Sequence, residues 1–108
     1  MRDDAYLAHI LEAIAAIESY TRDGREDFLT DRKTQDAVVR NLEIIGEAVK
    51  GLSESFRSAH SELPLRQLAG MRDRLIHQYF GIDLELLWAV VEKRLPELRR
   101  SIEQIQRR

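Results

Sequence analysis

The segment MRDRLIHQYF, residues 71–80, places reactive side chains among residues that are otherwise typical of a helix core. Arg72 carries a guanidinium that stays charged and presents a fork of N–H donors that fits phosphate oxygens. His77 is of the one residue type that ordinarily titrates near neutral pH, so it can accept or release a proton. Together the two types indicate anion binding combined with proton transfer. Taken one at a time, each also fits ordinary packing or surface pairing.

Helical geometry decides whether these groups can act together. Arg72 and Tyr79 are seven residues apart, about 20° from alignment, so they lie along one stripe about two turns apart. His77 is five residues from Arg72, about 140° around the helix, and points toward the edge of that face. We expect Arg72 and His77 to meet on one ligand only where the helix borders a cleft.

The elements that position the segment are predicted to be helices. Apolar residues recur at steps of three and four, as in Leu7, Ile10, Ile14 and Ile17, which is the pattern of an amphipathic helix. No stretch alternates with a period of two. The four predicted main helices cover about residues 3–20, residues 31–52, the run from Pro64 toward Tyr79, and the run that follows Asp83. The fold predicted for residues 1–108 is therefore a single all-α domain, an antiparallel bundle of four main helices.

Three finer features follow from single residues. A further short helix is predicted near residues 53–58, within a connection rich in serine. Pro96 removes a backbone donor inside the last helix, so a kink or break is expected near Arg94. Gly46 lies inside a helix at a cost of about 1 kcal/mol relative to alanine, which indicates a close approach by a neighbouring helix or side chain.

Composition excludes several classes of protein. The 108 residues are 44% hydrophobic and 33% charged, with no apolar run of membrane-spanning length, so a cytoplasmic protein without membrane contact is expected. The net charge of −2 argues against a protein that mainly grips long nucleic acids. Residues 93–108 carry six basic and two acidic residues, which we interpret as a solvated helix end. The absence of cysteine excludes disulfides, and no carboxylate cluster has metal-ligand spacing, so neither a metal nor a cofactor is expected.

Arg72, four residues, His77, one residue and Tyr79 reproduce a known motif, and the chain resembles the HepT-like proteins of the HEPN superfamily. The resemblance covers nearly the whole chain. It extends through YLAHILEAIAAIESY, DAVVRNLEIIGEAVKGLS, GMRDRLIHQYFGID and LLWAVVEKRLPEL. One departure is Asp73, since these proteins often have asparagine after the arginine, and another is Leu65, where tryptophan is often found.

The resemblance implies the toxin half of a toxin–antitoxin pair, a metal-independent endoribonuclease whose substrate is RNA, with tRNA as one candidate. Its chemistry suits the residues, because RNA cleavage without a metal needs a base for the 2′-hydroxyl proton, a cation for the phosphate and an acid for the leaving oxygen. His77 is assigned as base or acid, and Arg72 as the group that holds the phosphate.

One helix supplies only one such histidine. His9 and His60 lie in other segments, and we expect both to be incidental surface residues. A two-fold axis near the motif would bring two copies of Arg72 and His77 to one cleft. The resemblance likewise implies a homodimer with the motif at its cleft, so we expect the monomer to be inactive.

Tyr79 has a separate implied role. In HepT-like proteins the motif tyrosine receives AMP from an MntA-like nucleotidyltransferase, the antitoxin, which neutralises the toxin. AMP on the stripe of Arg72 would block a phosphate site by charge and by volume. This hypothesis requires an exposed Tyr79. The chain has no nucleotidyltransferase signature of its own, so the modifying activity must come from that partner.

Supporting residues and a competing function complete the predictions. Asp73 is a candidate for orienting Arg72 or His77, and Glu47 for positioning Arg72; the alternatives are a solvent-facing carboxylate and a surface salt bridge. Trp88 is expected to be a core or dimer contact. The competing function is a non-catalytic helical nucleotide-binding or regulatory partner of a nucleotidyltransferase, in which Arg72 and His77 contact phosphates and cut nothing. A plain structural bundle is a third possibility.

Overall fold

The computed structural model describes residues 2–77 and 81–107, and the regular elements among these residues are helices, with no strand. The main helices are α1 (Arg2–Tyr20), α3 (Arg32–Gly51), α5 (Leu65–His77) and a last helix in two parts, α6 (Leu84–Ala89) and α7 (Leu95–Gln106). Two short helices, α2 (Arg25–Thr30) and α4 (Glu54–Ala59), lie in the connections. The predicted all-α fold with four main helices is confirmed.

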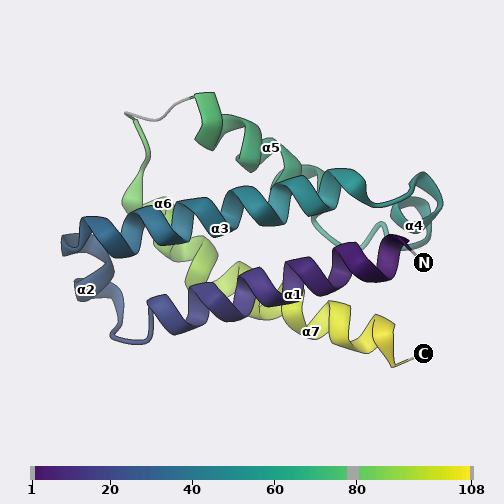
Figure 1. Cartoon of the computed structure of the whole chain (residues 1–108), viewed down its shortest axis with the longest axis horizontal. Coiled ribbons are helices and arrows are strands. Elements are labelled where there is room, and N and C mark those ends of the chain that lie inside the picture. Colours follow the sequence, from purple (N-terminus) through teal and green to yellow (C-terminus); the bar gives the residue numbers. More distant parts are fainter. Residues whose placement is uncertain (1, 78–80, 108) are drawn as a thin grey trace.

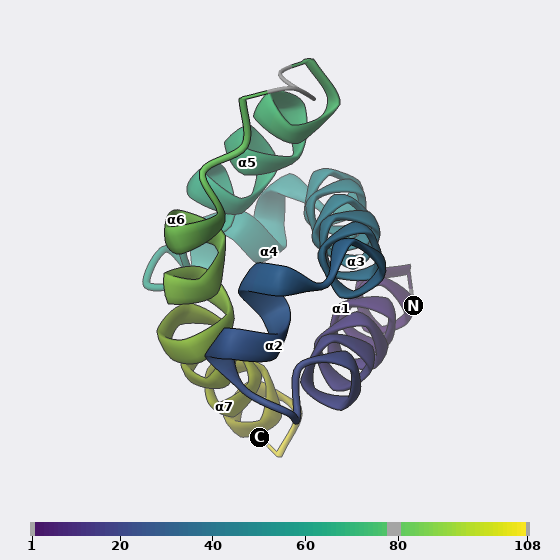
Figure 2. The same ribbon diagram turned by 90° about the vertical axis from the view of Figure 1, so that its left-hand side faces the viewer.

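The main helices run alternately up and down, with both chain ends at the same end of the bundle (Figure 1). Viewed from one end, they surround a common axis that α2 crosses (Figure 2). α3 packs against α1 on one side and α5 on the other, while α7 packs against α1. α3 therefore lies between the helix that carries Arg72 and the amino-terminal helix. None of the helices described is long and apolar enough to cross a membrane.

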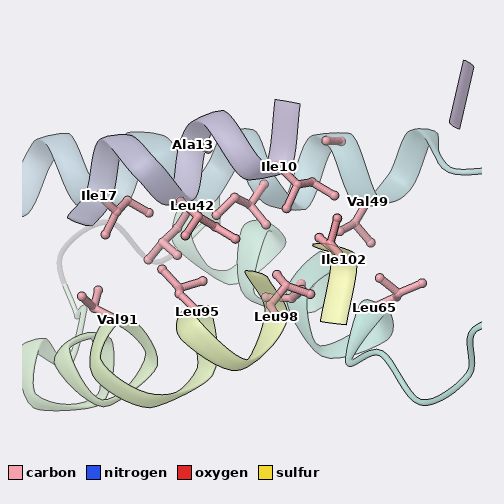
Figure 3. Packing of buried hydrophobic residues seen from close by; sticks show 14 of the residues in the cluster. Ile10, Ala13, Ile17, Leu42, Val49, Leu65, Val91, Leu95, Leu98 and Ile102 are labelled. Carbon is pink, nitrogen blue, oxygen red and sulfur yellow. The ribbon is translucent and has the colours of Figure 1, made fainter. Parts of the chain in front are cut away.

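The core lies along the inner faces of these helices (Figure 3). Burial of apolar surface is the main stabilising contribution in such a bundle, at about 25 cal/mol per Å². Large side chains that are completely or almost completely buried come from every main helix except α5, which contributes Leu68 and Leu75 at 6% and 5% exposure. The most buried are Ile10, Ile14, Ile17, Phe28, Val38, Ile45, Val49, Leu95 and Ile102.

Local capping explains where the helices begin. The Asp31 side chain accepts a hydrogen bond from the backbone N–H of Lys33 at the start of α3, and Asp83 accepts one from Leu86 at the start of α6. Ser53 caps α4 in the same way through the N–H of Phe56. Such caps satisfy amide donors that have no partner inside the helix. The predicted short helix near residues 53–58 is confirmed.

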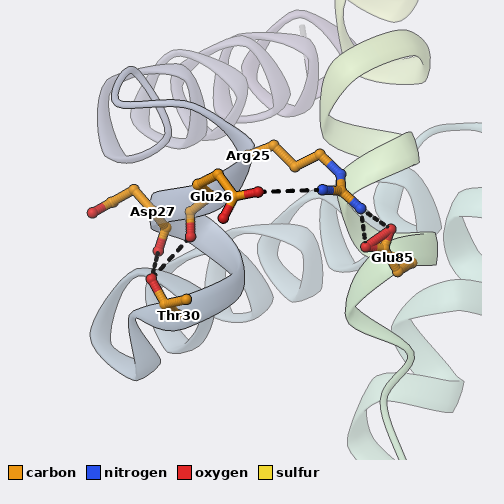
Figure 4. Close-up of polar contacts among 5 residues, drawn as sticks. All are labelled: Arg25, Glu26, Asp27, Thr30 and Glu85. Atoms are coloured by element: carbon orange, nitrogen blue, oxygen red, sulfur yellow. Dashed lines mark hydrogen bonds and ion pairs between the residues drawn. The ribbon is translucent and has the colours of Figure 1, made fainter.

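The short helix α2 was not predicted. It follows Gly24, whose positive φ of 92° suits glycine, and it is too short to show a periodic apolar stripe. Phe28 is completely buried and fixes α2 against the bundle. Arg25 adds an ion pair to the Glu85 carboxylate of α6, so α2 joins the first half of the chain to the last helix (Figure 4).

Pro96 interrupts the last helix as predicted, in the form of a π-helical turn. Residues Val90–Arg94 form this turn, and the N–H of Leu95 bonds to the carbonyl of Val90, five residues earlier. α7 then begins at Leu95 with Pro96 in its first turn, where a proline needs no amide partner. The predicted disruption near Arg94 is therefore confirmed, and its geometry is that of a wider turn inserted before a new helix.

Candidate functional site

Arg72 lies in the middle of α5 with its side-chain stem against α3. A Cβ placed on Gly46 would lie 2.2 Å from the Arg72 Cβ and 3.1 Å from the Leu68 carbonyl oxygen. Atoms cannot approach so closely, so any larger residue at position 46 would push the two helices apart. The predicted close approach at Gly46 is confirmed, and the group that approaches is the arginine of the motif.

The guanidinium of Arg72 is held by two carboxylates. Its Nη2 lies 2.7 Å from Glu47 Oε2 on α3, and its Nη1 donates to Asp73 Oδ1 at 3.1 Å. The Arg72 side chain is 26% exposed, so it is partly shielded and still open to a ligand. Both residues named as possible supports for Arg72 therefore contact it.

Asp73 is shared between two cations. Its Oδ1 also accepts a hydrogen bond from Lys50 Nζ of α3 at 2.6 Å. The hydrogen bonds from Lys50 and Arg72 lower the pKa of the Asp73 carboxyl from its ordinary value. Asp73 is thus ionised at neutral pH, and it links α5 to α3 through Lys50 next to the pair of Arg72 and Glu47.

The other two residues of the motif are only partly covered by the described structure. His77 is the last described residue of α5, and its backbone is helical. Tyr79 lies outside the described residues, as do the neighbouring Gln78 and Phe80. The predicted meeting of Arg72 with His77, and the predicted exposure of Tyr79, therefore stay predictions.

A groove of about 270 Å³ opens beside Arg72. α3 supplies its floor, α1 supplies Tyr6 and His9, and α5 supplies Arg72. The lining residues are Tyr6, His9, Arg40, Glu43, Ile44, Glu47, Ala48 and Arg72. The charges of its two arginines and two glutamates cancel, so the net charge of these four side chains is zero. The groove therefore offers cations and aromatic surface without a large excess of positive charge.

His9 was predicted to be an incidental surface residue, and the structure places it in the same groove as Arg72. Its ring meets Tyr6 edge to face, with centroids 6.4 Å apart and planes at 89°. The sequence signal was present only as the spacing of three between Tyr6 and His9 on the polar face of α1. That spacing cannot be told from ordinary surface residues until α5 is placed beside α3.

The prediction for His60 is wrong in its placement. The side chain is only 17% exposed, and its ring packs on Phe56 with centroids 4.5 Å apart, because the two residues are one helical turn apart at the end of α4. Trp88 packs on the buried Phe28, with centroids 5.5 Å apart, as expected for a core contact. Neither residue lies in the groove beside Arg72. Among the side chains that the structure describes, no group of three histidine or acidic residues is arranged to hold a metal ion.

Comparison with known proteins gives the family. The family model described as "Ribonuclease HepT-like" matches residues 10–105, which is most of the chain. The chain belongs to the HepT-like ribonuclease family.

Individual relatives agree with this assignment. The chain is 50% identical over 103 residues to the "Probable ribonuclease HepT" of Thermococcus cleftensis, covering 94% of each protein. It is 46% identical over 101 residues to a "Putative RNase" of Caldanaerobacter subterraneus, covering 93% of this chain and 90% of that protein. It is also 51% identical over 105 residues to a Methanocaldococcus jannaschii protein named as a gamma-glutamylcyclotransferase and putative RNase, of which it spans 47%. No solved structure shows a significant match.

Proposed function

We propose that this chain is a metal-independent endoribonuclease and the toxin of a toxin–antitoxin pair, with Arg72 and His77 as its catalytic residues. Membership of the HepT-like ribonuclease family supports the reaction class. The observation that carries the assignment to this site is the position of Arg72, which is held by Glu47 and Asp73 at the edge of an open groove. The two carboxylates hold the guanidinium in one orientation toward that groove.

In the proposed reaction a base removes the proton of an RNA 2′-hydroxyl, and that oxygen attacks the adjacent phosphorus. The bond from phosphorus to the 5′-oxygen breaks, and an acid protonates the leaving oxygen. The products are a 2′,3′-cyclic phosphate and a 5′-hydroxyl. His77 serves as base or acid, and Arg72 stabilises the extra negative charge on the phosphorane.

The contacts of Arg72 suit this task. A guanidinium has five N–H donors, and the contacts to Glu47 and Asp73 occupy one on each terminal nitrogen. Further donors stay available for phosphate oxygens while the carboxylates fix the orientation of the plane. Glu47 and Asp73 are proposed as positioning residues. Lys50 offsets part of the negative charge of Asp73, which reduces its repulsion of the phosphate.

A homodimer would complete the site. The reaction needs two proton-transfer groups, and the motif supplies one histidine in each chain. Two copies of Arg72 and His77 facing one cleft across a two-fold axis would provide both. In this proposal the isolated protomer binds RNA weakly and does not cut it.

Tyr79 is proposed as the point of control. An MntA-like nucleotidyltransferase would transfer AMP to its hydroxyl, adding negative phosphate and a bulky base to the motif that contains Arg72. Incubation with such an enzyme and ATP should add AMP to the parent chain and leave Tyr79→Phe unmodified by mass spectrometry. Modification of both proteins at the same extent would remove Tyr79 from this role.

The competing function is a non-catalytic nucleotide-binding partner of a nucleotidyltransferase. The groove and Arg72 would serve it equally well, since binding a phosphate does not require proton transfer. The two functions differ in what His77 does. A ribonuclease loses cleavage without His77, whereas a binding partner has no cleavage to lose.

The test incubates unmodified parent protein, His77→Ala and His60→Ala with total RNA and with tRNA in the presence of a chelator. His60→Ala is the matched control, because it removes an imidazole that lies outside the groove. We expect cleavage by the parent and by His60→Ala, and none by His77→Ala. Intact RNA with all three folded, unmodified proteins would favour the binding partner.

A further inference from the structure

The groove beside Arg72 is lined by two aromatic rings and a second arginine, which a site for a single phosphate would not need. We infer that it holds one nucleotide of the RNA next to the phosphate on Arg72, with the base against Tyr6 and His9 and a neighbouring phosphate on Arg40. This inference rests on the proposed function for the identity of its ligand. It adds a binding subsite made by α1 and α3, helices that contribute nothing to the arginine–histidine motif.

Two glycines of α3 fix the walls of this groove. A Cβ on Gly51 would lie 2.4 Å from the Tyr6 ring, just as a Cβ on Gly46 would collide with Arg72. Each glycine therefore lets one wall residue lie directly on the α3 backbone. Tyr6 and Arg72 are held on the two sides of α3 by packing, so the groove keeps its shape without a ligand.

The Tyr6–His9 pair offers a surface for a base. The two rings meet at 89°, so their edges and faces form an aromatic corner at the mouth of the groove. His9 is exposed, and neither ring makes a hydrogen bond or an ion pair to the described residues. Stacking of a base on such rings tolerates any sequence, because every base has a π-face.

Size and charge select a single nucleotide. A volume of about 270 Å³ lies just below the range of about 300–1,000 Å³ typical of pockets for drug-sized ligands. Arg40 is 72% exposed, and its contact to Glu43 is long at 3.9 Å, so its guanidinium is open to a phosphate. Glu43 and Glu47 offset the two arginines, which disfavours binding of a long polyanion by charge alone.

The test measures binding of a fluorescent five-nucleotide RNA by anisotropy over a range of salt concentrations. All proteins carry His77→Ala, so that the RNA stays intact. His9→Ala and Arg40→Ala change exposed groove residues, and Arg100→Ala removes another exposed cation from α7, which packs on α1. Circular dichroism of each variant serves as the control for correct folding.

We expect His9→Ala to raise Kd about fivefold or more through lost base stacking. Arg40→Ala should reduce the slope of log K against log salt by about 0.7, the value for one phosphate contact on a single strand. Arg100→Ala should change neither quantity. Equal Kd and equal slope for the groove variants and the Arg100 control would overturn the inference.

Failure of this inference and failure of the proposed function give different results. If the parent cuts RNA while His9→Ala and Arg40→Ala bind as tightly as the control, the groove is not a subsite and the ribonuclease stands. If the parent cuts no RNA while both groove variants bind more weakly, the subsite stands and the catalytic proposal fails.

Discussion

Arg72 is held from two helices before any substrate arrives. Glu47 reaches it from α3 and Asp73 from the next position of α5. Preorganised charge is worth more to a transition state than charge that must be collected during the reaction, because no reorganisation is needed at that moment. The sequence predicted Arg72, Glu47 and Asp73 as candidates, and the contact between Arg72 and Glu47 became visible only once α3 and α5 were placed side by side.

Arg72→Lys tests whether the fork of the guanidinium matters beyond its charge. Lysine keeps the positive charge and cannot hold two carboxylates and a phosphate in one plane. We expect RNA cleavage to fall by tenfold or more, with little change in the free energy of unfolding. Arg66→Lys is the control, because it changes an exposed arginine on the same helix, and this variant should cleave RNA at the parent rate. Equal rates for the two variants would show that charge alone suffices.

The Asp73 ion pairs predict a pH dependence of stability. Lys50 and Arg72 lower the pKa of Asp73 in the folded state below its ordinary value of 3.8. The stabilisation is therefore fully present above about pH 4 and is lost as the pH falls through the lowered value. In urea unfolding, the free-energy difference between the parent and Asp73→Asn should be constant from pH 7 to pH 5 and shrink below pH 4. A difference that grows on acidification would contradict this account.

At the scale of elements, long apolar stripes made the main helices predictable. α1 and α3 each bury residues at helical spacing over about three turns, and the ends of both helices agree with the prediction to within a residue. α2 was not predicted because a helix of six residues with one buried phenylalanine is too short to show a periodic apolar pattern. The groove could not be predicted from the sequence for another reason. Tyr6, His9 and Arg40 are surface residues of two helices, and they line one groove with Arg72 only because α1 and α5 both pack on α3.

Gly46 links the packing of α3 against α5 to the position of Arg72 in the groove. Gly46→Ala places a methyl group 2.2 Å from the Arg72 Cβ, so α3 and α5 must separate. We expect a loss of about 1–3 kcal/mol in the free energy of unfolding, the usual cost of overpacking, together with reduced RNA cleavage.

Gly70→Ala is the matched control, since a Cβ at that position meets no atom within 4 Å. It should stabilise the protein by about 0.5–1 kcal/mol, as expected for a helical glycine replaced by alanine. Equal stability changes for the two variants, measured by urea unfolding, would show that the close approach at Gly46 carries no strain.

At the scale of the whole molecule, the packing of the bundle brings one edge of α5 to the surface. Four main helices and α2 enclose a single core, and the arginine of the motif lies outside that core. In our proposal the chemistry takes place at the surface groove beside Arg72, and a second copy of the same chain completes the site.

The proposed dimer makes activity depend on concentration. Dilution below the dimer dissociation constant should reduce cleavage per chain in proportion to the remaining dimer, while the helical circular dichroism signal stays unchanged. Analytical ultracentrifugation gives the dissociation constant independently. Constant activity per chain across that transition would assign the complete site to one protomer.

The chemical nature of the RNA ends tests the central claim most directly. The fragments made by the parent protein in chelator are analysed by mass spectrometry, with His77→Ala as the blank. Attack by the 2′-hydroxyl predicts a 2′,3′-cyclic phosphate on one fragment and a 5′-hydroxyl on the other. Fragments that carry 3′-hydroxyl and 5′-phosphate ends, produced by the parent and not by the variant, would contradict the mechanism assigned to Arg72 and His77.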